Sequence, residues 1–247
     1  MSEPVLDVRE LEFAYPDGTR ALNGVSFRIG RGEAVGLIGA NGAGKSTLLM
    51  QLNACLMPAR GEVRVNGAAV TRQTAVAARR AVGLVFQDPD DQLFMPTVLE
   101  DVAFGPLNAG LAPAEAARMA SQALARVGME HLASRPPYKL SAGEKRAVAI
   151  ATVLALEPDV LVMDEPSSNL DPRGRRRLIG LLRSFGHTRL IATHDLELVV
   201  EVCPRVLVLD GGRIVADGPT AEVLNDEALM LAHGLERPHI LRHSHPH

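Results

Sequence analysis

The stretch GANGAGKS, residues 39–46, constrains the fold of this chain more than any other feature. It matches the pattern G-x-x-x-x-G-K-[ST], and it stands between a short apolar run, AVGLIG, and a helical pattern, KSTLLMQLNACL. Glycines let the backbone curl so that several N–H groups point at phosphate oxygens, at the positive end of the following helix. A strand, a glycine-rich turn and a helix in this order predict an α/β fold that binds a nucleotide phosphate at the turn.

The rest of the chain predicts one α/β domain that is interrupted by helices. Short runs rich in β-branched residues, such as NGVSFRIG, GEVRVNG, RLIAT and RVLVLD, indicate strands before and after an alanine-rich middle region. In that region Pro113 opens a helix that Gly128 closes, and Ser141 can cap the next one. We therefore expect a domain over residues 1–235 with a helical subdomain inserted at about 88–156.

Composition narrows the classes of function. The chain has 247 residues, 47% of them apolar, and a formal net charge of −3, which gives no reason to expect a general affinity for nucleic acid or anionic lipid. Two cysteines are too few for a disulfide framework and favour a reduced setting. The first ten residues do not resemble a signal peptide, and the longest apolar run, AVAIATVLAL, is about half of what a membrane span needs. A membrane role would therefore require a partner.

Charged side chains at two predicted strand ends suit a nucleotide with Mg²⁺. Lys45 would place its charge on the β- and γ-phosphates, and the Ser46 hydroxyl can ligate Mg²⁺. In VLVMDEP, four apolar residues predict a buried strand from whose end Asp164 and Glu165 emerge. Asp164 would hold Mg²⁺ and Glu165 would act as general base toward water. A solvated turn is the alternative for this carboxylate pair.

The segment LSAGEKRAVAIA, from Leu140, distinguishes among the many nucleotide-hydrolysing families. It resembles the signature sequence of the ABC ATPases, usually written LSGGQ, and we call Leu140–Glu144 the signature segment. The resemblance implies that Ser141, Ala142 and Gly143, at a helix N-terminus, cap the γ-phosphate held by another subunit, and such a helix start is a physically reasonable anion site. Without the resemblance, an ordinary N-capped amphipathic helix would explain the segment equally well.

Four further residues stand at positions that match the family in order and spacing. Tyr15 in FAYPDG resembles the aromatic that stacks on adenine, Gln87 the glutamine that reaches the metal and the attacking water, Asp171 in SSNLDP the D-loop aspartate that faces the partner subunit, and His194 in LIATHD the histidine that contacts the γ-phosphate. Taken singly, each has a structural explanation, such as turn packing, a polar strand end or a helix cap.

The resemblance implies three groups of site residues. The nucleotide-binding residues are Tyr15, Gly39, Asn41, Gly42, Ala43, Gly44, Lys45, Ser46, Thr47, Ser141, Ala142, Gly143 and Asp171. The catalytic residues are Glu165, His194 and Gln87, and the metal ligands are Ser46, Gln87 and Asp164. The cofactors are ATP and Mg²⁺.

The family also implies a fold and an assembly. The fold is an ABC-type P-loop NTPase, in which a RecA-like core sheet carries an antiparallel β subdomain and an inserted α-helical subdomain. Because the phosphate loop and the signature segment serve different subunits, the working unit is a head-to-tail dimer, and a homodimer of this chain can complete both sites. Two departures, Ala142 for the first signature glycine and Glu144 for the usual glutamine, leave an active ATPase as the expectation.

The stretch QDPDDQLFMPTVLEDVAFGPLNAG, which begins at Gln87, is similar to the energy-coupling-factor importers. In ABC importers this region receives the membrane partner, and exposed Leu93, Phe94 and Met95 beside three aspartates would suit such a contact. Subdomain core next to a solvated acidic loop is the alternative. The resemblance implies integral-membrane coupling and substrate-binding subunits as partners, no nucleic acid, and a peripheral position at the cytoplasmic face of the membrane.

Half of the eight histidines stand in the last nine residues, and they suggest a cargo. MLAHGLERPH and the histidine-rich tail, residues 236–247, resemble cobalt and nickel importers, whose ATPase is often a homodimer. HSHPH can bind Co²⁺, Ni²⁺ or Zn²⁺, although a solvated end explains it equally well. We therefore expect an ATPase that powers Co²⁺ or Ni²⁺ import. The alternatives are a vitamin importer of the same family, a soluble ABC ATPase that acts on DNA or ribosomes, and a small-molecule phosphotransferase.

Overall fold

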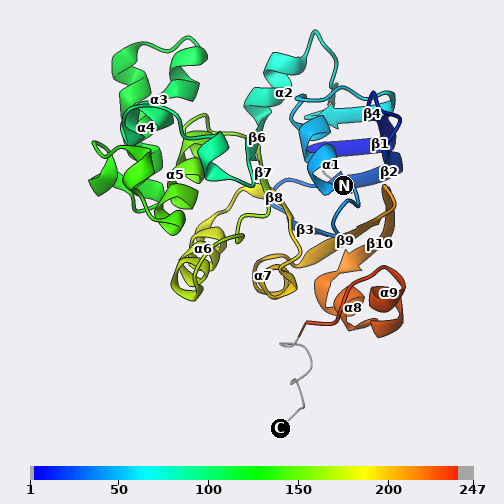
Figure 1. The fold of residues 1–247 in the computed structure, drawn as a ribbon. Coiled ribbons are helices and arrows are strands. Elements are labelled where there is room, and N and C mark those ends of the chain that lie inside the picture. Colours follow the sequence, from blue (N-terminus) through cyan, green and yellow to red (C-terminus); the bar gives the residue numbers. More distant parts are fainter. Residues whose placement is uncertain (1–2, 239–247) are drawn as a thin grey trace.

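The computed structural model describes residues 3–238 as two sheets with helices around them (Figure 1). The smaller sheet has four strands in the order β2-β1-β4-β5, all antiparallel to their neighbours. Its strands are β1 (Leu6–Ala14), β2 (Arg20–Ile29), β4 (Arg60–Val65) and β5 (Ala68–Ala69). This sheet corresponds to the expected antiparallel β subdomain.

The larger sheet has six strands in the order β10-β9-β3-β8-β7-β6. They are β3 (Ala34–Ile38), β6 (Val82–Val85), β7 (Val160–Asp164), β8 (Thr188–Ala192), β9 (Arg205–Asp210) and β10 (Arg213–Pro219). All neighbours are parallel except β10, which is antiparallel to β9. Strands β3, β6, β7 and β8 are buried along their whole length, as expected for a parallel sheet that is covered on both faces.

Nine α-helices accompany the sheets in the described part of the chain, and Figure 1 shows α3, α4 and α5 grouped together at one side of the molecule. They are α1 (Lys45–Leu52), α2 (Ala75–Ala81), α3 (Val98–Asn108), α4 (Pro113–Arg126), α5 (Ala142–Leu154), α6 (Pro172–Ser184), α7 (Leu196–Val202), α8 (Thr220–Asn225) and α9 (Glu227–Ala232). Helices α3 to α5 come between the neighbouring strands β6 and β7 in the sequence. The sequence analysis did not predict α2, α8 or α9.

Local chemistry fixes the helix ends that matter for the site. Pro113 stands in the first turn of α4. Gly128 follows the C-terminal end of this helix with a φ of +71°, a conformation that glycine adopts with less strain than any other residue. Ser141 is the N-cap of α5 and forms a capping box with Glu144. The signature segment therefore sits at a firmly defined helix start.

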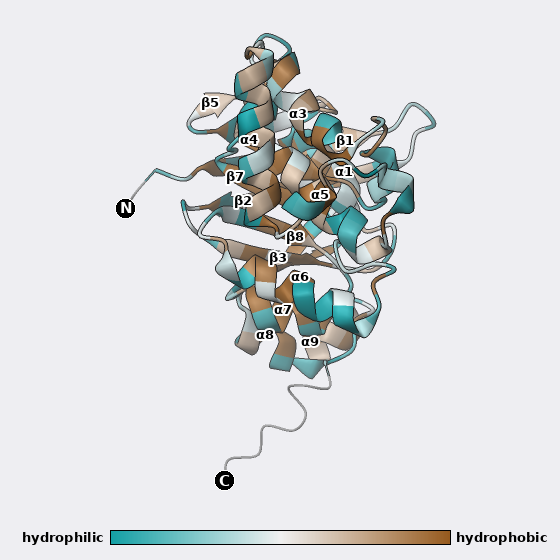
Figure 2. Ribbon diagram, turned by 90° about the vertical axis from the view of Figure 1, so that its left-hand side faces the viewer, coloured by the Kyte–Doolittle hydropathy of each residue, from teal (hydrophilic) through white to brown (hydrophobic). Residues whose placement is uncertain are grey.

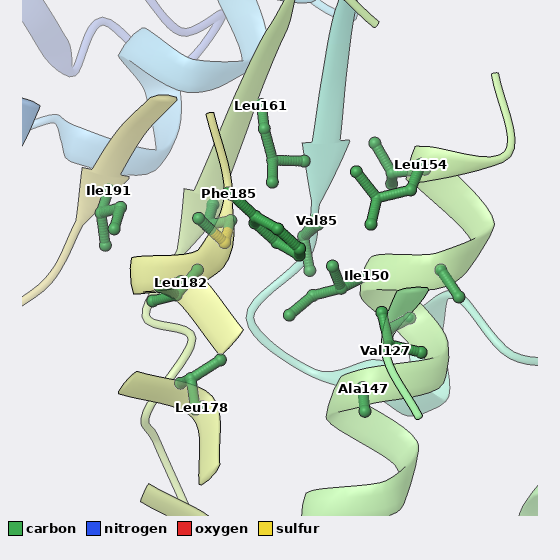
Figure 3. Close-up of a cluster of buried hydrophobic side chains, with 14 of the residues drawn as sticks. Val85, Val127, Ala147, Ile150, Leu154, Leu161, Leu178, Leu182, Phe185 and Ile191 are labelled. Atoms are coloured by element: carbon green, nitrogen blue, oxygen red, sulfur yellow. The ribbon is translucent and has the colours of Figure 1, made fainter. Parts of the chain in front are cut away.

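Helix α5 is anchored to the large sheet by an apolar core (Figure 3). Ile150 and Ala147 of α5 face Leu178 and Leu182 of α6, and Phe185 lies between the two helices in this view. Ile150 and Leu182 are fully buried. Because a packed core transmits displacement rather than absorbing it, the start of α5 is held in a defined position relative to the sheet.

Hydrophobic residues, shown in brown in Figure 2, are concentrated in the central strands β3 and β8. No helix within residues 3–238 is both long and apolar enough to cross a membrane.

One sequence expectation is wrong: Leu93 is buried, with 7% of its surface exposed, because it packs into the core cluster with Val98 and Val102. The histidine-rich part of the predicted tail, residues 239–247, lies outside the described residues.

Candidate nucleotide-binding site

A cleft of about 500 Å³ lies at the carboxyl ends of the parallel strands. Neighbouring strands contribute to it, because parallel strands end at the same edge of the sheet. Its lining residues are Tyr15, Thr19, Arg20, Ala21, Asn41, Gly42, Gly44, Lys45, Ser46, Thr47, Gln87, Asp164, Glu165 and His194. The cleft thus brings together most of the site residues that the sequence analysis selected from separate motifs.

The loop between β3 and α1 has the geometry that phosphate binding requires. Gly44 adopts a φ of +107° as the N-cap of α1, and a Cβ atom there would stand 2.4 Å from the carbonyl oxygen of Ala21. Gly39 also has no room for a side chain, since its Cβ would stand 2.1 Å from the carbonyl oxygen of Leu209. Gly39 and the buried Ala43 therefore support the loop from beneath rather than line the cleft.

Lys45 provides a buried positive charge at the floor of the cleft. Its side chain is 7% exposed, and its Nζ donates to the carbonyl oxygens of Gly39, at 2.8 Å, and Ala40, at 3.2 Å. The nearest carboxylate oxygen, Oε1 of Glu165, is 4.0 Å away. The charge of the Lys45 ammonium is poorly neutralised, because its two acceptors are neutral carbonyl oxygens and the carboxylate is distant. Binding of an anion in the cleft would therefore be strongly favoured.

Asp164 fits the requirement for a cation ligand. It ends β7, only 8% of its surface is exposed, and its Oδ1 is buried without a hydrogen-bond partner among the described residues. Burial raises the pKa of Asp164, while a hydrogen bond from the Ser46 hydroxyl opposes that rise. A carboxylate oxygen without a hydrogen-bond partner and a neighbouring hydroxyl are oxygen ligands of the kind that Mg²⁺ prefers. Gln87, which lines the same cleft, can add a third.

Glu165 is held in a fixed orientation by the loop that follows β8. Its Oε2 accepts hydrogen bonds from Thr193 Oγ1, at 2.9 Å, and from the His194 backbone N–H, at 3.2 Å. The same oxygen lies 2.8 Å from Nδ1 of His194. Glu165 also has a φ of +43°, an unusual backbone conformation that places its carboxylate toward the cleft. A carboxylate oriented in this way can position and deprotonate water.

Tyr15 stands at the outer end of the cleft, in the turn after β1. Its hydroxyl lies 2.9 Å from Oγ1 of Thr47 on α1, and its ring meets the Phe13 ring edge to face at 5.1 Å. These two contacts fix the ring while 37% of the residue stays exposed. Such a ring can stack on a nucleotide base. Thr19, Arg20 and Ala21 line the same end, and the sequence analysis missed them because they belong to no motif.

The signature segment and Asp171 do not line this cleft. Asp171 is the N-cap of α6, where its Oδ1 accepts a hydrogen bond from Gly174 N at 2.6 Å. Ser141 and Ala142 are exposed at the start of α5, and Gly143 approaches Gly174 of α6. These predicted site residues therefore form a second group in the same chain, at the starts of two neighbouring helices.

An ion pair that the sequence analysis missed links the two groups. Arg175 on α6 donates from Nε and Nη2 to the carboxylate of Asp195, at 2.8 and 2.9 Å. Asp195 follows His194, and its backbone N–H donates to Thr193 Oγ1 at 3.0 Å. The Arg175 guanidinium contributes to holding the pKa of Asp195 below its usual range against the effect of burial. The only sequence signal was the aspartate beside His194.

Comparisons with known proteins agree with this geometry. The ABC transporter family model matches residues 22–168. A putative ABC transporter ATP-binding protein of Geobacter sulfurreducens is 57% identical over 96% of each chain, and the energy-coupling factor transporter ATP-binding protein EcfA of Methanocaldococcus jannaschii is 44% identical over 96% of this chain and 86% of its own length. The structure of cbiO1 from Clostridium perfringens, part of the ABC transporter complex cbiONQ, has a TM-score of 0.83 at 39% identity and covers 98% of both chains. The chain belongs to the ABC transporter family, as an ATP-binding ATPase of the energy-coupling-factor type.

Proposed function

We propose that this chain, as a head-to-tail homodimer, powers the import of Co²⁺ or Ni²⁺ through an energy-coupling-factor complex at the cytoplasmic face of the membrane. The observation that carries the proposal is the whole-length similarity to cbiO1, a part of the cbiONQ transporter complex. Sequence features point the same way, since the histidine-rich tail and the segment before it resemble cobalt and nickel importers.

The separation of the two groups of site residues supports the dimer. A complete ATP site would need a second anion-binding group opposite the phosphate loop, and Ser141 and Gly143 lie outside the cleft of their own chain. The N-terminus of α5 can supply that group to a neighbouring chain. Because the nucleotide-binding cleft and the signature segment both occur in each chain, two copies related by a twofold axis would complete two sites.

The proposed chemistry assigns distinct tasks to residues of the cleft. Ser46, Asp164 and Gln87 would hold Mg²⁺, which neutralises charge on the phosphates when it is bound. Lys45 would bind the β- and γ-phosphates, and Tyr15 would stack on the base. Glu165 would take the proton from the attacking water while His194 holds the carboxylate and contacts the γ-phosphate. ATP would favour the closed dimer, and hydrolysis would remove that bias.

An exposed apolar patch supports a contact with a membrane subunit. Phe94 is 61% exposed and stacks edge to face on Phe104 at 5.0 Å, and Leu107 on the same helix α3 is also exposed. Beside this patch, Asp90 pairs with Lys145 of α5 at 2.5 Å. A membrane subunit that binds the patch would contact α3 and the segment before it, and the Asp90–Lys145 ion pair connects that segment to α5, which carries the signature segment.

The test is uptake of radioactive Co²⁺ and Ni²⁺ by vesicles that contain this ATPase with its co-purified membrane subunits. A matched complex with Glu165→Gln is the control, since it keeps the assembly and removes the proposed base. We expect ATP-dependent uptake that the control lacks. Normal ATPase activity without metal uptake would refute the metal cargo, and vitamins would be the next substrates to measure.

A further inference from the structure

We propose that Glu144 is a positioning residue that restrains ATP-driven closure of the dimer by holding the Ser141 hydroxyl. The inference rests on the proposed head-to-tail dimer, in which Ser141 meets the γ-phosphate of the partner's nucleotide. Ser141 is exposed at the start of α5, and its Oγ donates to Oε2 of Glu144 at 2.8 Å. Its backbone N–H donates to the same oxygen, also at 2.8 Å.

The first part of the argument is the proton count. A serine hydroxyl has one proton to donate, and in this structure that proton points to the Glu144 carboxylate. A phosphate oxygen that approaches Ser141 needs the same proton and the same helix N-terminus. Closure must therefore break the hydrogen bond from Ser141 to Glu144, and a bond to a charged acceptor is stronger than one to a neutral acceptor.

The second part is charge. After the hydroxyl turns to the phosphate, the Ser141 backbone N–H still holds the Glu144 carboxylate beside it. Two oxygens that each lie about 2.8 Å from the hydroxyl are at most about 5.6 Å apart, so a γ-phosphate bound at Ser141 would lie close to this carboxylate. Two like charges about 4 Å apart, even when screened as in water, change an equilibrium constant about fivefold. Arg135 and, when it is protonated, His131 oppose this effect, because their positive charge offsets part of the negative charge of Glu144.

Capping of the helix does not by itself require the negative charge. A glutamine at the third helical position serves a capping box as well as a glutamate does, because its side-chain oxygen can accept the bond from the N-cap backbone. The chain contains an internal comparison at the start of α3. There Thr97 Oγ1 donates to Oε2 of Glu100 at 2.7 Å, and Glu100 N donates back to Thr97 Oγ1 at 3.3 Å. Glu100 thus accepts the hydroxyl bond as Glu144 does, lacks the bond from the N-cap backbone N–H that Glu144 accepts, and lies outside the nucleotide cleft.

The experiment measures the ATP concentration that gives half-maximal dimer, by light scattering after size-exclusion chromatography. All proteins carry Glu165→Gln, so that bound ATP persists and the closed state accumulates. The parent is compared with variants that also carry Glu144→Gln or, as the matched control, Glu100→Gln. We expect Glu144→Gln to lower the required ATP concentration about fivefold or more, and Glu100→Gln to leave it unchanged. High salt should narrow the difference between Glu144→Gln and the parent, because salt screens charge.

A purely structural role for Glu144 predicts that Glu144→Ala, which removes the cap as well as the charge, lowers the unfolding temperature and raises the ATP requirement. The inference predicts instead that the unfolding temperature and the ATP requirement of Glu144→Ala both fall. If the ATP requirement of Glu144→Gln equals that of the parent, or rises with either variant, the inference is wrong although the proposed dimer stands. If the parent itself stays monomeric with ATP, the proposed dimer fails, and the inference fails with it.

Discussion

Replacing Asp164 by asparagine should make the nucleotide-free protein more stable. The wild-type carboxylate is buried, and its Oδ1 has no hydrogen-bond partner within the described residues. Asparagine keeps a buried polar group but removes the charge, and we take the extra cost of the buried charge as about 1–3 kcal/mol. For a chain of this size each 1 kcal/mol shifts Tm by about 2–4 °C. Asp164→Asn should therefore raise Tm by about 2–12 °C in nucleotide-free buffer with a chelator.

The pH dependence gives this prediction a sign that can be checked. Because burial raises the pKa of Asp164, its ionised form is less favourable in the folded protein than in the unfolded chain. The contribution of Asp164 to stability is complete below the unfolded pKa of about 3.9 and is lost as pH rises through the folded pKa. The advantage of Asp164→Asn should thus be absent at low pH and reach a plateau above the folded pKa.

The neighbouring Glu165 provides a control with the same change of charge. Its carboxylate accepts hydrogen bonds from Thr193 Oγ1 and from the His194 backbone, and it lies 2.8 Å from the His194 ring nitrogen. Glu165→Gln loses acceptors that these donors need, so Tm should fall or stay unchanged. Differential scanning calorimetry of the two variants and the wild type measures both effects. A fall in Tm for Asp164→Asn, or the same sign for both variants, would refute the reasoning that Asp164 is kept for a cation at the expense of stability.

Three further substitutions test other contacts of the site. Tyr15→Ala should weaken ATP binding about 5- to 150-fold in an equilibrium titration, because base stacking contributes about 1–3 kcal/mol, whereas Tyr15→Phe should keep most of the affinity; equal losses would rule out stacking. His194→Ala should reduce the rate of phosphate release about 100-fold or more, a larger effect than the loss of one γ-phosphate contact has on ATP affinity, and a normal rate would contradict the role of His194 in holding Glu165. Arg175→Ala should lower the free energy of unfolding by about 1–3 kcal/mol in urea titrations, since it leaves the Asp195 carboxylate without its bidentate partner; Arg175→Lys should recover part of that loss.

Site residues that follow the parallel strands in the sequence were predictable, because these strands end at the same edge of the sheet. Ser46, Gln87, Glu165 and His194 follow β3, β6, β7 and β8, which are neighbours in the sheet in the order β3-β8-β7-β6. Each strand was recognisable as an apolar run followed by a polar or glycine-rich stretch. Once the fold class is known, the strand ends must lie at one edge, so four distant motifs meet in one cleft.

Features set by tertiary packing were not predictable in the same way. Helices α8 and α9 have six residues each, too few to be stable alone, and they rest on the buried side chains of Leu224 and Met230. Leu93 follows a single 3-10 turn, Pro89–Asp91, where no period shows which way a side chain points. Its burial beside the exposed Phe94 therefore became visible only in the structure.

The signature segment shows how local and distant information differ. The sequence predicts that Ser141 caps a helix, and the capping box with Glu144 confirms this prediction. It does not predict the direction in which the helix start faces, because that depends on the packing of α5 against α6 and the large sheet. In the structure the helix start lies outside the cleft of its own chain. The local role of Ser141 as a helix cap can therefore be predicted from the sequence, whereas its proposed contact with the nucleotide of another copy has to be tested in the dimer.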